Sequence, residues 1–267
     1  MTSDAAHNVD EVSPAIEVTD DLFLGGALRV RQPKRGYRAG LDAVLLAAAC
    51  PVLSEHRTRC LDCGAGAGVA GLSVAHRIGN LSVSFVERDA ELADLAMHNI
   101  AVNGLSERCN VVRADLTRPL SQLAALSADA GCFDHVLANP PFHAHGEGTR
   151  AADRHKDGSH AMQAGTFEAW ARFAASMARN GGSFTIIQRP DALPEILAAL
   201  SRRFGRVKIL PLHSRDGQPA SRVLIQAIKG SRAALQILPG RTLHLHGSHV
   251  FTPAFDAILR LGAALEL

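Results

Sequence analysis

Short apolar runs alternate with amphipathic stretches along most of the chain. The apolar runs predict strands at Arg59–Cys63, Leu81–Glu87, Asn110–Ala114, Phe133–Ala138, Ser183–Gln188, Val207–His213 and Arg222–Lys229. Helical periodicity between them predicts a helix that ends at Ile78 and further helices over Ala90–Asn103, Phe167–Ala178, Asp191–Arg203 and Ala254–Leu261. Repeated strand–helix units form a mainly parallel sheet with helices on both faces. We therefore expect an α/β fold with a mostly parallel seven-stranded sheet, and, since no helix separates the last two strands, an antiparallel edge hairpin.

The segment before this domain carries its own pattern. We expect residues 1–20 to form a flexible arm. Alternating apolar residues around Gly25-Gly26 predict a β-hairpin. An apolar helix follows and stops at Pro51. We therefore expect a short hairpin and helix extension over residues 21–56, followed by one α/β domain over residues 57–267.

Composition places the chain among globular proteins. It has 267 residues, of which 47% are hydrophobic and 20% charged, and its net charge is +2. An odd count of five cysteines favours reduced thiols and a cytoplasmic protein. The longest apolar stretch, Ala43–Leu53, is too short to cross a bilayer, and the acidic N-terminus lacks the basic start of a secretory signal. We expect neither membrane association nor export.

A glycine-rich segment between the first strand and its helix fits two ligand-binding templates. Gly66, Gly68 and Gly71 match the dinucleotide fingerprint of nicotinamide oxidoreductases, in which a later acid binds ribose. Asp62 with Gly64, Gly66 and Gly68 matches the loop of class I methyltransferases that use S-adenosyl-L-methionine. The methyl donor carries an ammonium group and no phosphate, so an acid beside the loop suits it. A tight turn without ligand is the third interpretation.

Two acids end the next strands of the predicted sheet. The Glu87 carboxylate can accept hydrogen bonds from a ribose diol, and Asp115 can accept one from an adenine amino group. Open α/β sheets bind ligands at the carboxyl ends of their strands. Each acid alone is equally consistent with a solvated strand end, but together they predict a nucleoside site.

The segment Asn139-Pro140-Pro141-Phe142 directly follows the fourth predicted strand. The two prolines fix the backbone and remove two N–H donors. We expect the side-chain oxygen of Asn139 and the C=O of Pro140 to point outward as a pair of acceptors, which suits an amine with two N–H donors. Phe142 would stack on a planar substrate. A rigid turn without function is the alternative, but its place after the glycine loop and the two acids favours methyl transfer to a planar nitrogen.

In this order, the motifs resemble those of class I amino-methyltransferases. The N-terminal "QPKRGYRAGLDAVLLAAA" and the late "FTPAFDAILR" resemble segments of the bacterial tRNA adenine-N6 methyltransferases that act on a valine tRNA, so the likeness covers about residues 20–260. The resemblance implies a Rossmann-like class I methyltransferase fold, S-adenosyl-L-methionine as cofactor and S-adenosyl-L-homocysteine as product. It also implies RNA as the partner, with adenine N6 in tRNA as the first candidate for the modified group.

The same resemblance assigns roles to residues. It implies that the methionine part of the cofactor is held by Asp62, Gly64, Ala65, Gly66 and Gly68. Glu87 would hold the ribose, and Asp115 and Leu116 the adenine. Asn139, Pro140, Pro141 and Phe142 would hold the target amine, and Tyr37 and Arg38 would close over the cofactor carboxylate.

One departure keeps other substrates open. His143 follows Phe142, as in guanine-N2 methyltransferases of ribosomal RNA, whereas the valine-tRNA group usually has a second aromatic residue there. Protein-glutamine methyltransferases share the Asn-Pro-Pro start. Adenine, guanine and amide targets are therefore all possible, beside the remoter oxidoreductase and a cofactor-binding module that docks RNA without chemistry.

Two further groups of residues bear on the substrate. Four histidines in the polar segment after the turn fit no metal-ligand spacing, so we expect no metal site and assign this segment to a substrate-facing flap (His143, His145, His155 and His160, with Arg150, Arg154 and Lys156). Basic residues with few acids between them mark the C-terminal half (Arg202, Arg203, Arg206, Lys208, Arg215, Arg222, Lys229 and Arg232). They could contact RNA phosphates or form an ordinary solvated face.

Overall fold

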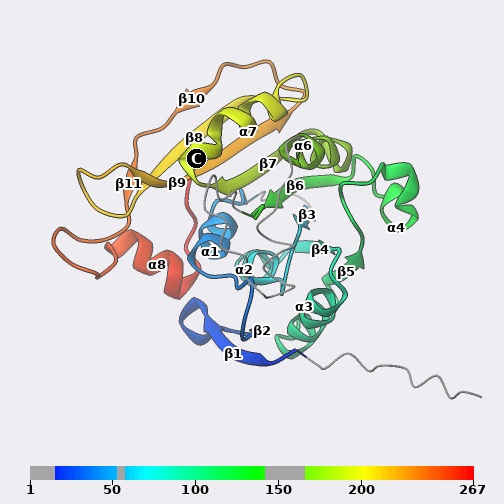
Figure 1. Cartoon of the computed structure of the whole chain (residues 1–267), viewed down its shortest axis with the longest axis horizontal. Coiled ribbons are helices and arrows are strands. Elements are labelled where there is room, and N and C mark those ends of the chain that lie inside the picture. Colours follow the sequence, from blue (N-terminus) through cyan, green and yellow to red (C-terminus); the bar gives the residue numbers. More distant parts are fainter. Residues whose placement is uncertain (1–15, 53–57, 142–165) are drawn as a thin grey trace, which may run out of the picture.

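The computed structural model describes residues 16–52, 58–141 and 166–267. These residues form a two-stranded hairpin and a nine-stranded sheet with the order β10-β8-β9-β7-β6-β3-β4-β5, in which β11 also pairs with β8 (Figure 1). The core strands are β3 (Thr58–Cys63), β4 (Leu81–Glu87), β5 (Cys109–Arg113), β6 (Phe133–Ala138), β7 (Ala178–Gln188), β8 (Phe204–His213) and β9 (Ala220–Lys229). Strands β3 to β7 are parallel, which agrees with the predicted mostly parallel sheet.

The antiparallel hairpin is β8 with β9, and β9 pairs with β7. It is not the edge of the sheet, however, because β10 (Gln236–Ile237) and β11 (Arg241–Thr242) pair with β8 in parallel. The prediction of seven strands was therefore two strands short. A strand of two residues is too short to show alternation, so the sequence carries no pattern for it.

Helices cover both faces of the sheet, as predicted. One face packs on α1 (Leu41–Ala48), α2 (Val69–Arg77), α3 (Ala90–Val102) and α8 (Pro253–Leu261). The other packs on α4 (Ala124–Ser127), α6 (Thr166–Met177) and α7 (Leu193–Leu200), with short 3-10 turns at η2 (Leu120–Gln122) and η3 (Pro190–Ala192). Side chains of a strand alternate between these layers: Phe85 of β4 is buried on the α2 side, and Val86 on the α6 side.

The N-terminal hairpin joins the main core. Strands β1 (Val18–Phe23) and β2 (Leu28–Pro33) are antiparallel and flank the turn η1 (Leu24–Gly26). Leu28 and Val30 are buried in the same apolar cluster as helices α1 and α2. Strand β1 begins before residue 20, so part of the predicted arm is a strand, and residues 1–15 lie outside the described residues. The domain boundaries at residues 20 and 56 stay a prediction.

Most predicted elements lie within a few residues of the observed ones. The observed β4 and β6 have the predicted first and last residues. The observed β7 begins at Ala178 instead of the predicted Ser183. The sequence suggested a turn at the glycine pair before Ser183, but the strand runs through this pair. Helix α7 is shorter than predicted, with Pro190 and Pro194 confining its start. No helix within the described ranges is long and apolar enough to cross a membrane.

Candidate functional site

Strand order brings the predicted motifs to one edge of the sheet. β3 lies between β4 and β6, and Cys63 at its end pairs with Val86 on one side and Ala138 on the other. The next residues along these strands are Gly64, Glu87 and Asn139. The strand order reverses at β3, and ligands of open α/β sheets bind at such a switch point, outside the carboxyl ends of the strands.

The glycine loop between β3 and α2 adopts a backbone that favours glycine. Gly64, Gly66 and Gly68 have φ values of 62°, 58° and 92°, in the left-handed region. A side chain at Gly64 would also collide with Trp170 of α6, because its Cβ would lie 2.5 Å from the indole ring. Gly64 is partly exposed, whereas Gly66 and Gly68 are buried, so the glycines let the loop pack closely at the start of α2.

Asp62 ties this loop to the helix that follows. Its carboxylate Oδ2 accepts a hydrogen bond from the N–H of Gly71 at 2.8 Å, within the first turn of α2. Gly68 is the N-cap residue of α2 and has no side chain, so Asp62 caps the helix from the neighbouring strand. Burial raises the pKa of Asp62 to about 7, opposed by the Gly71 hydrogen bond and supported by the charge of Glu87. Its contact with the methionine part of the cofactor stays a prediction.

Glu87 fixes the loop from the other side. Its Oε2 accepts from the N–H of Gly66 at 2.8 Å, and its Oε1 accepts from the N–H groups of Arg88 and Asp89 at 2.8 and 2.9 Å. A carboxylate oxygen has more than one acceptor site, so these bonds leave capacity for a ribose hydroxyl. The side chain is 7% exposed at the end of β4.

Asp115 and Leu116 follow β5 at the same edge. Asp115 Oδ1 accepts from the N–H and the hydroxyl of Thr117 at 3.0 and 2.6 Å. Partial burial acts to raise the pKa of Asp115, but the Thr117 hydrogen bonds and the charges of Arg88 and Arg118 outweigh it and lower the pKa. Leu116 is buried among the apolar residues of the α6 layer. Asp115 is therefore an ionised acid with one oxygen engaged.

The turn after β6 is held by two side chains. The amide Nδ2 of Asn139 donates to the hydroxyl of Tyr37 at 3.2 Å, and the C=O of Pro140 accepts from Nε2 of Gln188 at 3.0 Å. Within the described part of the chain, no donor bonds to Asn139 Oδ1. We predicted that the Pro140 carbonyl points outward as an acceptor for the substrate. In the structure, one of its two lone pairs already accepts the hydrogen bond from Gln188. Pro141 is partly buried, and Phe142 lies outside the described residues.

Tyr37 links this turn to the glycine loop. A Cβ at Gly66 would lie 3.4 Å from the Tyr37 ring, whose hydroxyl contacts Asn139. Burial raises the pKa of Tyr37, and the nearby charges of Asp62, Asp42 and Glu87 raise it further, so the phenol stays neutral. Tyr37 thus lies between the two motifs, and its contact with the cofactor carboxylate stays a prediction.

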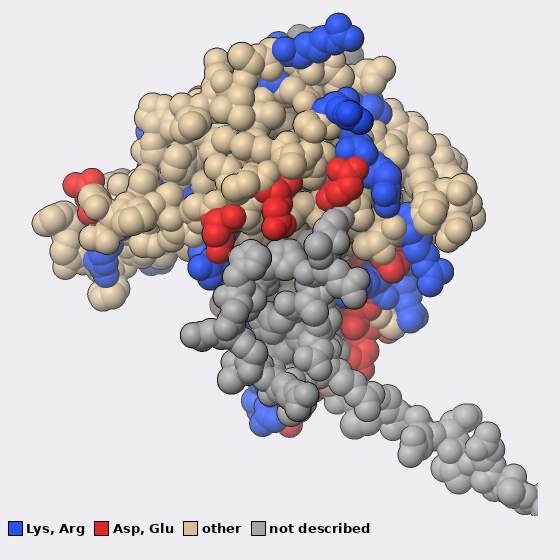
Figure 2. Space-filling model, turned by 45° about the horizontal axis from the view of Figure 1, so that its top comes forward, with Lys and Arg blue, Asp and Glu red and all other residues tan. Residues whose placement is uncertain are grey.

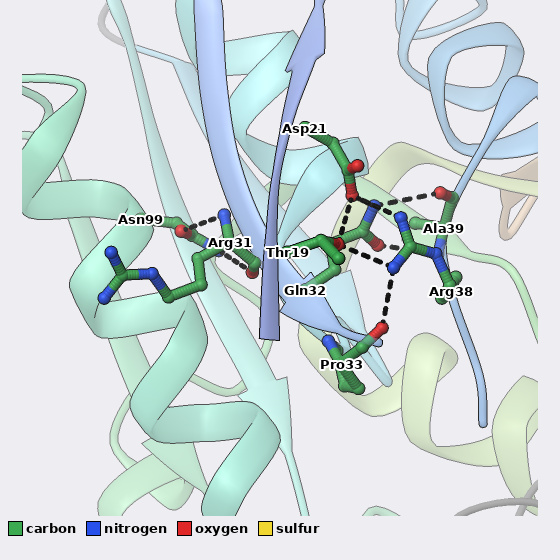
Figure 3. A network of polar contacts seen from close by, with 8 residues as sticks. All are labelled: Thr19, Asp21, Arg31, Gln32, Pro33, Arg38, Ala39 and Asn99. Carbon is green, nitrogen blue, oxygen red and sulfur yellow. Dashed lines mark hydrogen bonds and ion pairs between the residues drawn. The ribbon is translucent and has the colours of Figure 1, made fainter. Parts of the chain in front are cut away.

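Arg38 points elsewhere. Its guanidinium forms an ion pair with Asp21 at 2.6 Å and donates to Thr19 Oγ1 and the C=O of Pro33, so it is held by the hairpin (Figure 3). These contacts do not support the predicted contact of Arg38 with the cofactor carboxylate. The residue instead fixes the segment that carries Tyr37.

A second set of polar contacts joins the hairpin to the loop. Asn99 of α3 accepts from the N–H of Arg31 at 2.8 Å and donates to its C=O at 2.9 Å, as a neighbouring strand would (Figure 3). Its Nδ2 also donates to the C=O of Ala67 at 2.9 Å. Gln32 makes a similar pair of bonds to Ala39. The hairpin therefore positions Tyr37 over the glycine loop.

Sequence reasoning missed three residues of this site. Gln188 ends an apolar strand, as Glu87 does, and that position could have marked it as a candidate. Trp170 and Asn99 lie within helices whose sequence pattern gives no sign of a contact with the glycine loop. Their roles follow from tertiary packing alone.

The C-terminal basic residues do not form one face. Five of the eight contact protein groups, namely Arg203 with Glu168, Lys208 with the C=O of Leu267, Arg215 with the C=O of Ser248, Arg222 with Asp42 and Lys229 with the C=O of Ala178. Phe204 pairs with Lys229 at the amino end of the parallel strands, so the residues around that pair lie opposite the candidate site. Phosphate binding by this group as a whole is therefore not supported. The four histidines after the turn lie outside the described residues.

Comparison with known proteins agrees with this geometry. Residues 42–213 match the family model of the methyltransferase small domain. A tRNA1(Val) (adenine(37)-N6)-methyltransferase of Shewanella sp. strain W3-18-1 is 30% identical over 194 residues, which are 71% of this chain and 76% of the relative. A solved structure from Agrobacterium tumefaciens, described as a predicted O-methyltransferase, is 34% identical with a TM-score of 0.71, covering 85% of this chain and 99% of that one.

A second solved structure shows the fold alone. It is the 16S rRNA N2 G1207 methyltransferase of T. Thermophilus, which is 21% identical with a TM-score of 0.52 and matches 80% of this chain and 50% of that one. The predicted Rossmann-like class I methyltransferase fold is confirmed. The chain belongs to the methyltransferase small domain family, and it is an S-adenosyl-L-methionine-dependent methyltransferase.

Proposed function

We propose that this enzyme methylates an exocyclic amine of a nucleic-acid base, and that this base is adenine in tRNA, modified at N6. One observation carries the proposal: Tyr37 joins the Asn139-Pro140 turn to the glycine loop at Gly66, so the amine site and the methyl-donor site adjoin. The name of the Shewanella relative supports adenine N6 in tRNA.

The loop and the two strand-end acids fit the methyl donor. The loop has positive φ values at Gly64, Gly66 and Gly68, and Gly64 and Ala65 are partly exposed. The carboxylate of Asp62 bonds to Gly71 at the start of the helix that follows the loop. Glu87 would accept from the ribose, and Asp115 with Leu116 would hold the adenine. When bound, the donor supplies a methyl group on a sulfonium sulfur, which keeps the electron pair of the broken carbon–sulfur bond.

The turn after β6 suits an amine better than a hydroxyl. Asn139 Oδ1 and the second lone pair of the Pro140 C=O provide two acceptors, and an exocyclic amine has two N–H donors. A hydroxyl has one. Both oxygens would stabilise the positive charge that develops on the nitrogen as it attacks. This argument favours a nitrogen target over the oxygen target named for the Agrobacterium structure.

Exposed arginines at the same edge support an RNA substrate. Arg88, Arg118 and Arg189 each follow the carboxyl end of a strand, and all three are exposed. Figure 2 shows Lys and Arg side chains along the right-hand side of one face, with Asp and Glu side chains among them. The guanidinium groups of these three arginines would contact phosphates while the target base, unpaired or flipped out, enters the site. Because tRNA modification takes place where tRNA is used, and the five cysteines are unpaired, we assign the enzyme to the cytoplasm.

Guanine N2 in ribosomal RNA is the second candidate, because His143 follows Phe142 as in that group. The test supplies purified enzyme and labelled methyl donor with unmodified tRNA, ribosomal RNA or protein, and identifies the product by mass spectrometry of nucleosides and peptides. We expect N6-methyladenosine in tRNA. N2-methylguanosine would support the second candidate, and methyl transfer to a hydroxyl or to protein would overturn the proposal.

A variant pair tests the mechanism. Asn139→Ala removes one acceptor and should abolish turnover while S-adenosyl-L-homocysteine still binds, as measured by calorimetry. Asn180→Ala is the matched control, since Asn180 is exposed near the start of β7, at the opposite edge of the sheet. Normal turnover of Asn139→Ala would contradict the role of this turn.

A further inference from the structure

Gln188 is the last residue of β7 and lies beside the Asn139-Pro140 turn. Its side chain is 1% exposed, and Pro140 is buried as well. Nε2 donates to the C=O of Pro140 at 3.0 Å, and Oε1 accepts from the N–H of Arg189 at 2.9 Å. A carbonyl can only accept and an N–H can only donate, so these two partners fix the orientation of the amide.

The Pro140 carbonyl lies beyond the end of the strand ladder that would otherwise supply its donor. The ladder between β6 and β7 ends where Ala138 pairs with Ile186. Asn139 still has an N–H, whereas Pro140 and Pro141 have none, so the main chain cannot donate to β7 from Pro140 onward. The Gln188 side chain supplies a donor at the point where the ladder stops and anchors the carbonyl in place.

We infer that Gln188 is a positioning residue for methyl transfer: it holds one lone pair of the Pro140 carbonyl and thereby aims the other at the target amine. The inference rests on the proposed function, in which that carbonyl is an acceptor. Gln188 itself does not touch the substrate. It sets the direction of an oxygen that does, and small misplacements of such groups cost large factors in rate.

The alternative is that Gln188 only stabilises the fold, and Gln188→Glu separates the two. A neutral glutamic acid keeps the shape and donates through its O–H to Pro140, whereas the ionised form has no donor and repels the carbonyl. Burial at this position raises the pKa of a carboxyl above its usual value of about 4.3, so the kcat of this variant should fall as pH rises and the carboxyl ionises, relative to wild type at each pH. A purely structural role would change stability without adding this titration to kcat.

A matched control is available in β9. Gln226 is also buried, at 8% exposed, and its Nε2 also donates to a main-chain carbonyl, that of Ala49, at 3.2 Å. It does not contact the turn. Gln226→Glu should therefore show the wild-type dependence of kcat on pH in the folded protein. Gln188→Leu, which has no donor at any pH, completes the set.

The experiment measures methyl transfer to unmodified tRNA from pH 6 to pH 9, together with the affinity for S-adenosyl-L-homocysteine and the melting temperature. For Gln188→Leu we expect kcat to fall about 10- to 100-fold, with cofactor affinity and KM within about twofold. Gln188→Glu should approach wild-type kcat at the acid end only.

The outcomes are distinct. If wild type is active and both Gln188 variants keep its kcat and pH profile, the role of Gln188 is overturned while the proposed function stands. The same holds if kcat falls only in proportion to the folded fraction, or if Gln226→Glu shows the same new titration. A wild type that methylates no RNA overturns the proposed function and, with it, the role assigned to Gln188.

Discussion

Asn99 and Asn103 form a natural pair of test sites on helix α3. Asn99 bonds to both main-chain groups of Arg31, and Asn103 bonds to both main-chain groups of Arg29 in the same way, at 3.0 and 2.8 Å. The two differ in burial, since Asn99 is 0% exposed and the Asn103 contacts are exposed to solvent. Asn99 alone also bonds to Ala67 in the glycine loop. Asn103 in turn donates to the C=O of Asn99 at 2.7 Å. Substitution of each by alanine therefore compares a buried residue that also holds the glycine loop with a solvent-exposed one that does not.

The magnitude follows from the groups left without partners. Asn99→Ala strands one N–H and two C=O groups, and at about 1 kcal/mol each, the low end for buried groups, the loss is about 3 kcal/mol. The better helix propensity of alanine returns about 0.5 kcal/mol. Water can replace the exposed contacts of Asn103, so Asn103→Ala should cost less than about 1 kcal/mol. We expect a difference of about 2 kcal/mol between the variants.

Urea denaturation followed by circular dichroism measures this difference. Calorimetry with S-adenosyl-L-homocysteine should in addition show weaker binding for Asn99→Ala, because the C=O of Ala67 loses its partner. Equal losses of stability in the two variants would refute the reasoning from burial. An unchanged cofactor affinity in Asn99→Ala would refute the link between the hairpin and the loop.

Three further changes test the site. Burial raises the pKa of Asp62 to about 7, against about 3.9 in the unfolded chain. The free enzyme therefore loses stability as pH rises from about 3.9 to about 7. Asp62→Asn should remove this loss, and denaturation experiments at pH 8 should find this variant more stable than wild type. Gly64→Ala should cost at least about 2 kcal/mol, from its φ of 62° and its contact with Trp170. Tyr37→Phe loses the bond to Asn139 and should lower kcat about fivefold in tRNA methylation assays, since one hydrogen bond contributes about 1 kcal/mol.

Each of these has a control. Near pH 4 Asp62 is protonated in the folded state, so wild type and Asp62→Asn should have similar denaturation midpoints there; a constant difference across pH would contradict the assigned titration. Gly79→Ala meets nothing within 4 Å and should be close to neutral, and equal effects at Gly64 and Gly79 would count against the steric argument. For Tyr37→Phe, a loss of cofactor affinity without a change in kcat would indicate that Tyr37 acts in binding the methyl donor and not in positioning the target amine.

The strand ends of the site were predictable from the sequence because each is marked by a local contrast. Glu87 and Asn139 are polar residues directly after apolar runs, and a parallel sheet brings such positions to one edge. The resemblance to amino-methyltransferases added the roles of these residues. The dipeptide strand at Gln236–Ile237 has no such contrast and was missed.

Side-chain partners were harder to predict because they depend on register between distant segments. Gln188 and Pro140 are 48 positions apart in sequence, and Arg38 pairs with Asp21 across the hairpin. The family resemblance assigned Arg38 to the cofactor carboxylate, whereas in the structure its guanidinium pairs with Asp21 of β1. The same dependence on tertiary packing hid the contact between Trp170 and Gly64.

Side chains from three different elements hold the main chain of the glycine loop and of the helix turn after it: Asp62 bonds to Gly71 in α2, Glu87 to Gly66 and Asn99 to Ala67. Because these hydrogen bonds already restrict the loop in the free protein, binding of the methyl donor should cost little conformational entropy of the loop. Free and donor-bound enzyme should therefore share one backbone path from Gly64 to Gly68, and the association rate should resemble that of a rigid receptor instead of one that must first reorganise.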